Sequence, residues 1–369
     1  MKELLDILDA MERFAAAGER MALATIVFVR GSTYRREGAR LLLTAGQQMV
    51  GNISGGCLES DIMVVADEVM ASGKARLATY DLTADDDAVW GLGLGCNGAV
   101  DVFVEPLDPS SRQWTLLREV SAAEESATLA KVLDGPRAGR WMLVRSHGPR
   151  VESLGDGAFD ERAARASAAA MTEGASRTIT LPGDGGDVRV FVEVLRPPVR
   201  LIICGAGHDA VPVVQFAAQL GWRTVVVDQR QRFLNHDRFP GAQRFIHSEP
   251  SEAAGVVPLD DRTYVVIMTH NYLHDRDLLR GFLATPVRYV GMLGPRIRTE
   301  KILDELTTAG VAIRPEDRAR IYGPIGLDIG GEGAEAIALA LLGEIHAVEA
   351  GRAGGLLRDR KGPIHAPAR

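Results

Sequence analysis

The chain has 369 residues, 46% of them apolar and 25% charged, a balance typical of a globular protein with more than one core. Its formal net charge of −7, with no basic stripe, excludes a protein that binds nucleic acid through the phosphate backbone. No apolar run reaches the roughly 18 residues of a membrane span, and the acidic, helical N-terminal pattern is not that of a signal peptide. Three scattered cysteines form no disulfide framework, so we expect a cytoplasmic protein that binds neither nucleic acid nor membranes.

The first half, residues 1–196, contains one succession of segments twice. The first copy, at about 20–107, runs from LATIVFVRGS and ARLLLT through the glycine-rich GNISGGCLESD and a helix to the strand VDVFVEPL. The second copy, at about 126–195, runs from LAKVLDGP and RWMLVRSHGP through GDGAFDER and a helix to VRVFVEVL. The shared order and closing Val-Phe-Val-Glu indicate a duplication within one mixed α/β domain, although chance could also give the tetrapeptide.

The two copies differ at one thiol. Alignment places GCLE, which contains Cys57, against GAFD, which contains Ala158. Ser54 fits an N-cap, so Cys57 is expected in the first helical turn, where the helix dipole stabilises a thiolate. A thiolate is a good ligand for a soft metal, which makes Cys57 a candidate reactive group and molybdenum ligand. The alternative is a small buried residue that closes a loop, with drift explaining the difference between the copies.

The second half, residues 197–349, follows the joint Pro197-Pro198 and has the pattern of a Rossmann unit. A buried strand, a glycine turn, an apolar-periodic helix and a second buried strand follow one another in RLIICGAGHDAVPVVQFAAQLGWRTVVVDQR. Gly205 and Gly207 would let backbone N–H groups approach a pyrophosphate at a helix N-terminus. Asp228 ends the second strand about 20 residues later, where a carboxylate would accept hydrogen bonds from ribose hydroxyls. We expect residues 350–369 to be a disordered tail.

Other polar residues fall near the carboxyl edge of the predicted parallel sheet. His208 follows the glycine turn and is a candidate acid, base or phosphate contact; the alternative is a helix-capping histidine without chemistry. His270 ends a later strand, TYVVIMTH, at the edge where open α/β sheets bind ligands. The spacing of the polar residues that follow His270 fits no standard zinc pattern. Asp328, in the loop GPIGLDIGG, is expected to face the same edge and to orient a ligand or Arg296.

Seven stretches, in order along most of residues 21–348, resemble the XdhC/CoxI family. They are RGSTYRREGARLLLT, GNISGGCLES, GCNGAVDVFVEPL, GAGHDAVPVVQFAAQLGWRTVVVDQR, VIMTHNYLHD, YVGMLGPR and GPIGLDIG. The resemblance implies a two-domain α/β accessory protein that matures xanthine dehydrogenase and related molybdenum hydroxylases. This chain departs from the family pattern after Cys96, at Pro295, and at Gly331-Glu332-Gly333.

The resemblance implies a chaperone more than an enzyme with turnover. It would bind molybdenum cofactor, support its sulfuration with a cysteine desulfurase, and insert it into an apo-hydroxylase. The thiol loop would hold the molybdenum end, and the Rossmann crevice a pterin or nucleotide part such as NAD, FAD or a cytosine dinucleotide. The predicted cofactor-binding residues are Arg35, Arg36, Arg40, Ser54, Gly55, Gly56, Cys57, Cys96, Gly205, Gly207, His208, Asp228, His270 and Asp328.

Two other interpretations remain open at the level of sequence. The main alternative is an NAD(P)- or flavin-dependent oxidoreductase with His208 as its acid or base, and such an enzyme would have no need of the thiol-bearing half. A pure docking scaffold would leave the glycine turn without a ligand. Because a large cofactor has to be enclosed, we also expect a homodimer.

Overall fold

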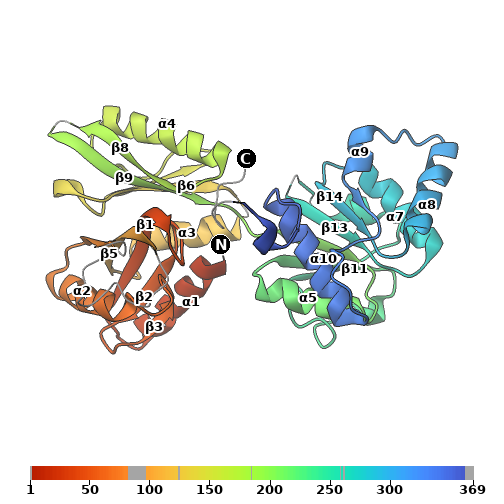
Figure 1. The fold of residues 1–369 in the computed structure, drawn as a ribbon, viewed down its shortest axis with the longest axis horizontal. Coiled ribbons are helices and arrows are strands. Elements are labelled where there is room, and N and C mark those ends of the chain that lie inside the picture. Colours follow the sequence, from red (N-terminus) through yellow and green to blue (C-terminus); the bar gives the residue numbers. More distant parts are fainter. Residues whose placement is uncertain are drawn as a thin grey trace. The chain divides into compact units, whose positions relative to one another are not determined.

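The computed structural model describes residues 2–81, 97–123, 125–183, 185–257, 259–260 and 262–361. The chain divides into two compact units, Met1–Pro197 and Pro198–Arg369. The predicted fold class is confirmed, because the first unit consists of antiparallel sheets with helices and the second has a wholly parallel sheet (Figure 1). Within the described ranges, no helix is both long enough and apolar enough to cross a membrane.

The first sheet of unit one has five strands in the order β3-β2-β1-β5-β4, and its neighbouring strands run antiparallel. The helix α2 separates β3 from β4 in the chain. The bounds of these elements are β1 Met21–Ser32, β2 Arg40–Thr44, β3 Met49–Gly51, α2 Glu59–Ser72, β4 Arg76–Asp81 and β5 Asn97–Leu107.

The second sheet has the order β7-β6-β9-β8, which repeats the β2-β1-β5-β4 order of the first. An isolated bridge between Leu143 and Val151 stands where the first sheet has β3. The helix α4 corresponds in chain position to α2. The bounds are β6 Ala127–Val132, β7 Trp141–Arg145, α4 Gly157–Glu173, β8 Arg177–Gly183 and β9 Gly186–Leu195, with a 3₁₀ turn η1 at Gly135–Arg137.

Each sheet of unit one is covered on its outer face by its own helix, while the inner faces of the two sheets pack on each other. Apolar residues of α2 pack on the first sheet and those of α4 on the second (Figure 1). Between the sheets, Val27 and Phe103 of the first copy contact Leu133 and Phe191 of the second. The helices α1 (Lys2–Ala16) and α3 (Arg112–Ala122) contribute to a core shared by both copies.

Two buried ion pairs cross the interface between the copies. Arg40 of the first copy pairs with Glu193 of the second, and Lys131 of the second pairs with Glu105 of the first. The two glutamates are the closing residues of the repeated Val-Phe-Val-Glu, and no side chain of the four is more than 12% exposed. A buried charge without its partner is strongly destabilising, so these pairs fix how the two sheets dock.

Unit two is a six-stranded parallel sheet in the order β12-β11-β10-β13-β14-β15. The helices α5 and α10 pack on one face, and α6, α7 and α8 on the other. Because β10 and β13 are neighbours without being consecutive, the strand order reverses between them, and this is where open α/β sheets bind ligands.

The bounds of the elements in unit two complete the fold. The strands are β10 Arg200–Cys204, β11 Arg223–Asp228, β12 Arg244–His247, β13 Thr263–Ile267, β14 Tyr289–Met292 and β15 Ile321–Tyr322. The helices are α5 Ala210–Gln219, η2 Gln231–Phe233, α6 Ala253–Val256, α7 Tyr272–Leu283, α8 Arg296–Thr308, α9 Pro315–Ala319, α10 Ala334–Glu349 and η3 Leu357–Asp359. The last of these, η3, lies within the segment expected to be a disordered tail, and residues 362–369 are outside the described ranges.

Candidate functional site

The thiol of Cys57 lies in a loop that is folded around one hydroxyl and one carboxylate. The Ser54 hydroxyl accepts hydrogen bonds from the backbone N–H of Gly56 at 3.0 Å and of Leu58 at 3.2 Å. Glu59 accepts from the Ser54 backbone N–H at 2.9 Å and from the Ser54 hydroxyl. Ser54 and Leu58 are buried, whereas Gly55 and Gly56 are exposed and Cys57 is partly exposed. The buried contacts therefore hold the loop while its glycines and thiol remain accessible.

The carboxylate of Glu59 is held in its charged form. Burial alone would raise the pKa of Glu59, but hydrogen bonds from the hydroxyl and backbone of Ser54 outweigh it and leave the pKa below its ordinary value. A negative charge in the first turn of α2 also interacts favourably with the helix dipole.

The predicted position of Cys57 in the first helical turn is wrong. The helix begins at Glu59 with Leu58 as its N-cap, so Cys57 precedes it. The Ser54 hydroxyl accepts hydrogen bonds from N–H groups of the loop and does not cap α2. Cys57 instead packs at the edge of the core beneath α2. It is therefore partly buried, as the packing alternative expects, but it remains partly exposed, as a reactive thiol requires.

The three arginines of the preceding hairpin are in three different situations. Arg40 is buried, its guanidinium binds Glu193 and the Gly38 carbonyl, and we assign it a structural role in place of the predicted cofactor contact. Arg35 forms an ion pair with Glu3 of α1. Arg36 has a buried Nε without a hydrogen-bond partner among the described residues, so it retains a free donor. The predicted second thiol, Cys96, lies outside the described residues.

The glycine turn after β10 has the form that the sequence predicts. Gly205 has φ +120°, and a Cβ there would lie 2.6 Å from the Met268 carbonyl oxygen, so only glycine fits. Gly207 follows beside His270, and His208 is exposed. The turn thus brings backbone close to the switch point between β10 and β13.

The loops after β10 and β13 are joined by a contact between a histidine and a carboxylate. His270 Nε2 lies 3.0 Å from an oxygen of Asp209, which is the N-cap residue of α5. His270 has φ +59°, a left-handed conformation that is uncommon for a residue other than glycine. The predicted edge position of His270 is therefore accompanied by a partner, Asp209, that the sequence alone did not single out.

The predicted role of Asp228 as a free acceptor for ribose hydroxyls needs correction. Its carboxylate accepts hydrogen bonds from the Ala206 N–H at 2.7 Å and from the backbone and guanidinium of Arg230 at 2.8–2.9 Å. Burial would raise the pKa of Asp228, but these bonds outweigh it and lower the pKa. A carboxylate has about four acceptor sites, and all four are used here. Because Asp228 is only 8% exposed and holds the glycine turn, its removal is expected to destabilise the fold.

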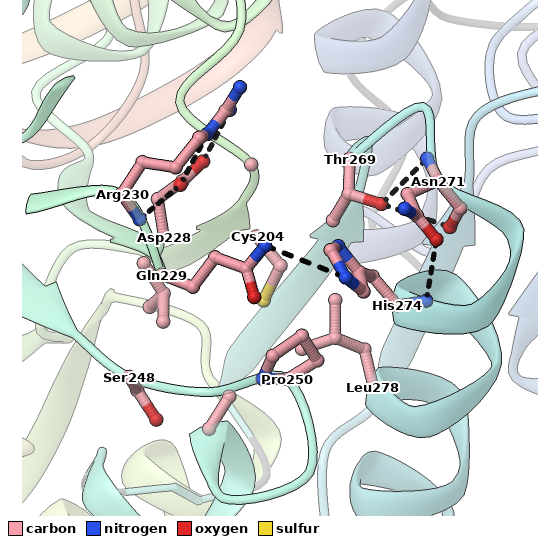
Figure 2. Close-up of a pocket in the computed structure, with 13 residues that line it drawn as sticks. Cys204, Asp228, Gln229, Arg230, Ser248, Pro250, Thr269, Asn271, His274 and Leu278 are labelled. Atoms are coloured by element: carbon pink, nitrogen blue, oxygen red, sulfur yellow. Dashed lines mark hydrogen bonds and ion pairs between the residues drawn. The ribbon is translucent and has the colours of Figure 1, made fainter.

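A cavity of about 230 Å³ opens beside these residues at the carboxyl edge of the sheet. Its polar lining includes Asp228, Gln229, Ser248, Asn271 and His274 (Figure 2). The cavity combines an apolar floor with a few convergent polar groups, a composition typical of small-molecule sites.

The polar lining near α7 is itself anchored. Asn271 caps α7 by accepting from the N–H groups of Leu273 and His274. Figure 2 shows Asn271 beside His274 in the cavity lining. The Thr269 hydroxyl donates to Asp275, a carboxylate only 1% exposed that Arg298 also contacts. Cys204 forms part of the cavity wall. Burial, followed by the charges of Asp275 and Asp228, raises the pKa of this thiol, so it stays neutral.

Two predicted features are not brought together with this cavity. Asp328 lies in the loop after β15 and does not line the cavity, and Arg296 is exposed at the start of α8. Among the described residues, no group of three or more His, Cys, Asp or Glu side chains is arranged to hold a metal ion.

Sequence reasoning missed Arg230 and Glu193, for which signals existed. An arginine two residues after the acid of the second strand is spaced to fold back on it, and the structure shows this contact. A glutamate inside the apolar run VRVFVEVL signals a buried cation partner, since buried acids are seldom unpaired. Arg40 itself gave no sign that it was that partner.

The fold and its sites define a class: an α/β protein with one unit of two antiparallel sheets in a repeated strand order, which carries a thiol loop, and a Rossmann unit with a ligand-sized cavity. Residues 201–345 match the XdhC Rossmann domain, and residues 14–81 match the XdhC and CoxI family. The chain belongs to the XdhC and CoxI family.

Relatives match over most of the chain. A probable xanthine dehydrogenase subunit of Bacillus subtilis is 28% identical over 328 residues, covering 89% of this chain and 92% of the relative. A molybdenum cofactor insertion chaperone of Escherichia coli, PaoD, is 23% identical over 336 residues, covering 90% and 84%. An uncharacterized Escherichia coli protein, YqeB, is 32% identical over 252 residues, which cover 64% of this chain and 46% of YqeB.

A solved structure shares the whole fold. The crystal structure of a protein described as a xanthine dehydrogenase from Bacillus halodurans superposes with a TM-score of 0.76 and is 29% identical. The match covers 98% of both chains, so it includes the antiparallel unit as well as the Rossmann unit.

Proposed function

We propose that the protein is an accessory factor that binds molybdenum cofactor and delivers it to a xanthine dehydrogenase-type molybdenum hydroxylase. Similarity over 90% of the chain to a molybdenum cofactor insertion chaperone supports this role, as does the similarity to a probable xanthine dehydrogenase subunit. The observation that carries the proposal is the loop around Cys57, in which a partly exposed thiol stands beside two exposed glycines.

The loop has the chemistry that such a cofactor requires. A thiolate binds a soft metal or accepts a sulfur atom, and either role needs the sulfur of Cys57 to be accessible. The hydrogen bonds among Ser54, Glu59 and the loop backbone hold the thiol in place without covering it. Arg36 of the neighbouring hairpin forms no ion pair with any residue that the structure describes, so its positive charge is suited to an anionic group of the cofactor.

The Rossmann unit supports the second part of the proposal. The turn at Gly205 and Gly207 and the adjoining cavity of about 230 Å³ are suited to a pterin or nucleotide portion, such as that of NAD, FAD or a cytosine dinucleotide. The expected protein partners are the apo-hydroxylase and a cysteine desulfurase that supplies sulfur. A homodimer is part of the proposal, and light scattering of the purified protein tests it.

The test removes the thiol and measures two properties. Cys57→Ala should remain folded, because Ala158 stands at the corresponding position of the second copy. We expect co-expressed hydroxylase activity to fall to the level seen without the accessory protein. Molybdenum and pterin that copurify with the variant are measured in parallel.

The two measurements separate the roles of the thiol. Lost retention together with lost activity indicates a metal ligand, whereas normal retention with lost activity indicates sulfur transfer. The matched control is Val64→Ala, an exposed apolar truncation on α2, which should change neither property. Normal retention and normal activity of Cys57→Ala would rule out the thiol loop as the site.

A further inference from the structure

Three arginines surround one aromatic ring at the carboxyl edge of the Rossmann sheet. The guanidinium carbons of Arg230, Arg232 and Arg238 lie 4.4, 5.0 and 4.9 Å from the centre of the Phe233 ring. All four residues belong to the loop between β11 and β12, which includes η2. The ring orders the three charges by cation–π contact although they repel one another.

The positive charge of this cluster exceeds the negative charge that balances it. Arg230 pairs with Asp228. Arg232 and Arg238 form no ion pair with any residue that the structure describes, and Asp237 in the same loop contacts none of the three through a salt bridge within those residues. Three guanidinium groups and one carboxylate therefore leave two positive charges unbalanced.

The cluster adjoins the glycine turn and the cavity. Arg238 donates to the Ala206 carbonyl at 3.2 Å, which places its guanidinium against the turn, and its Nε is buried without a partner among the described residues. Arg230 lines the cavity itself (Figure 2). A ligand that lies on the turn and enters the cavity would therefore pass these side chains.

We propose that Arg230, Arg232 and Arg238 form a subsite for a dianionic phosphate monoester, so that the crevice prefers ligands that carry this group. The inference rests on the proposed role of the crevice in binding a pterin or nucleotide part. The charge of a phosphate monoester matches the two unbalanced positive charges. The planar forks of arginine bind its oxygens bidentately.

The hydrogen bonds that Asp228 already accepts explain why the crevice should prefer a phosphorylated ligand. In a dinucleotide crevice, the acid at the end of the second strand accepts hydrogen bonds from ribose hydroxyls, and a nearby arginine accommodates a 2′-phosphate instead. Here Arg230 occupies the acceptor oxygens of Asp228, so a ribose with free hydroxyls gains little from that acid. A phosphate at the same place meets guanidinium groups.

Two kinds of ligand carry the required group. One is a dinucleotide with a phosphate on its ribose, and the other is a pterin that ends in a phosphate monoester. Matched pairs distinguish them: NADP⁺ against NAD⁺, and neopterin monophosphate against neopterin. Titration calorimetry of the full chain with each of the four compounds gives the affinities.

We expect the phosphorylated member of at least one pair to bind at least about tenfold more tightly, as charge-assisted hydrogen bonds allow. Arg232→Ala should remove most of that advantage while leaving the affinity of the unphosphorylated member unchanged. Arg238→Ala should also remove it, and because Arg238 donates to the Ala206 carbonyl of the glycine turn, it should weaken both members of a pair. Arg232 is exposed, so its variant tests the subsite without endangering the fold. The advantage should also shrink as salt is added.

Arg230→Ala gives the sharpest outcome, because it frees the acceptor oxygens of Asp228. In the NADP⁺/NAD⁺ pair, it should weaken NADP⁺ and strengthen NAD⁺. The charge-matched control is Arg280→Ala, an exposed arginine in the last turn of α7, which runs away from the carboxyl edge; it should leave every affinity unchanged.

The results separate this inference from the proposed function. Preference in one pair alone supports the subsite and identifies its ligand class. Equal affinities within both pairs would overturn the subsite but leave a ligand-binding crevice. Failure of all four compounds to bind would overturn the subsite together with the proposed role of the crevice.

Discussion

The two copies in unit one begin their helices differently. In the second copy, α4 begins at Gly157, and the Asp156 side chain caps it by accepting from the Phe159 N–H at 2.9 Å. The position in the first copy that aligns with Asp156 is Gly55, which has no side chain to cap a helix. The helix α2 begins only at Glu59, three residues later than the alignment with α4 would place it.

The two helix starts nevertheless share their anchoring contacts. Leu58 and Phe159 are both buried, and the acid that follows each accepts a hydrogen bond from a loop N–H: Glu59 from Ser54, and Asp160 from Leu154. The anchoring contacts are thus common to both copies. The first copy, which has no side-chain cap, has a glycine loop where the second copy has a helical turn, and the thiol lies in this loop.

The largest effect should come from moving the thiol between the copies. In a Cys57→Ala/Ala158→Cys double variant, the sulfur sits in a capped helical turn and no longer in the open loop. We expect hydroxylase activation to fall to background, as in Cys57→Ala alone, and Ala158→Cys alone to keep full activation. Activation is measured on the co-expressed hydroxylase, and any rescue by the moved thiol would show that loop geometry is unimportant.

Glu59 and Asp160, the two acids that accept a hydrogen bond from a loop N–H, should differ in how much each stabilises the fold. Asp160 is 5% exposed, so Asp160→Ala leaves the Leu154 N–H buried without a partner and should cost about 1–3 kcal/mol. Glu59→Ala should cost less, because Glu59 is only partly buried, but should release the Cys57 loop and the cofactor. Urea unfolding measures the first effect and copurified molybdenum the second. Asp160→Asn, which keeps an acceptor oxygen, should recover part of the loss, and a larger cost at Glu59 would contradict the comparison.

Restoring the missing cap should make the copies alike. In Gly55→Asp, the new carboxylate is positioned to accept from the Leu58 N–H, as Asp156 does from Phe159. Because it would replace the Ser54 hydroxyl as the acceptor of that N–H, the gain in stability at the helix start should be less than the about 1 kcal/mol of a new cap. Amide exchange in residues 55–58 should slow, and cofactor retention should fall because the loop backbone is no longer open. Gly55→Ala offers no cap and serves as the control; unchanged exchange in Gly55→Asp would mean that the loop is held open by something other than the lost cap.

The smallest effect should be a shared response to acid. The pKa of Glu59 is lowered by the Ser54 hydrogen bonds against the effect of burial, and the pKa of Asp156 is lowered chiefly by the Phe159 N–H. A group whose pKa is lower in the folded state stabilises above its unfolded pKa, near 4, and that contribution is lost as pH falls through the folded value. Both helix starts should therefore loosen below about pH 4.

Hydrogen exchange of peptides that cover the two helix starts, corrected for intrinsic rates, measures this response. Glu59→Gln should abolish the pH dependence in the first copy and leave it intact in the second. Loosening of both copies in that variant would assign the effect to global unfolding.

The sequence predicted the elements that depend on local pattern. The glycine turn at Gly205, the parallel strands and the repeated order of unit one follow from periodicity and turn chemistry within short windows, and the fold class is confirmed. The predicted roles of individual side chains were wrong where the interaction partner is remote in sequence or was not considered. Arg40 forms an ion pair with Glu193, which is 153 residues away in the sequence. Ser54 was predicted to cap a helix, but its hydroxyl accepts hydrogen bonds within the loop. Asp228 looked free because the arginine two residues later, although spaced to fold back on it, was not considered as its partner.

The crossed ion pairs of unit one have a consequence for how the chain can be divided. A break between α3 and β6 would leave Arg40 and Glu105 on one fragment and Lys131 and Glu193 on the other, so each fragment would carry a cation and an acid that lack their partners. Such fragments are complementary halves of a split protein. Exchanging the charges of one pair, as in Arg40→Glu with Glu193→Arg, would give a second set of halves that assembles with itself and rejects the first. The ion pairs between the two sheets therefore also determine which fragments can assemble with each other.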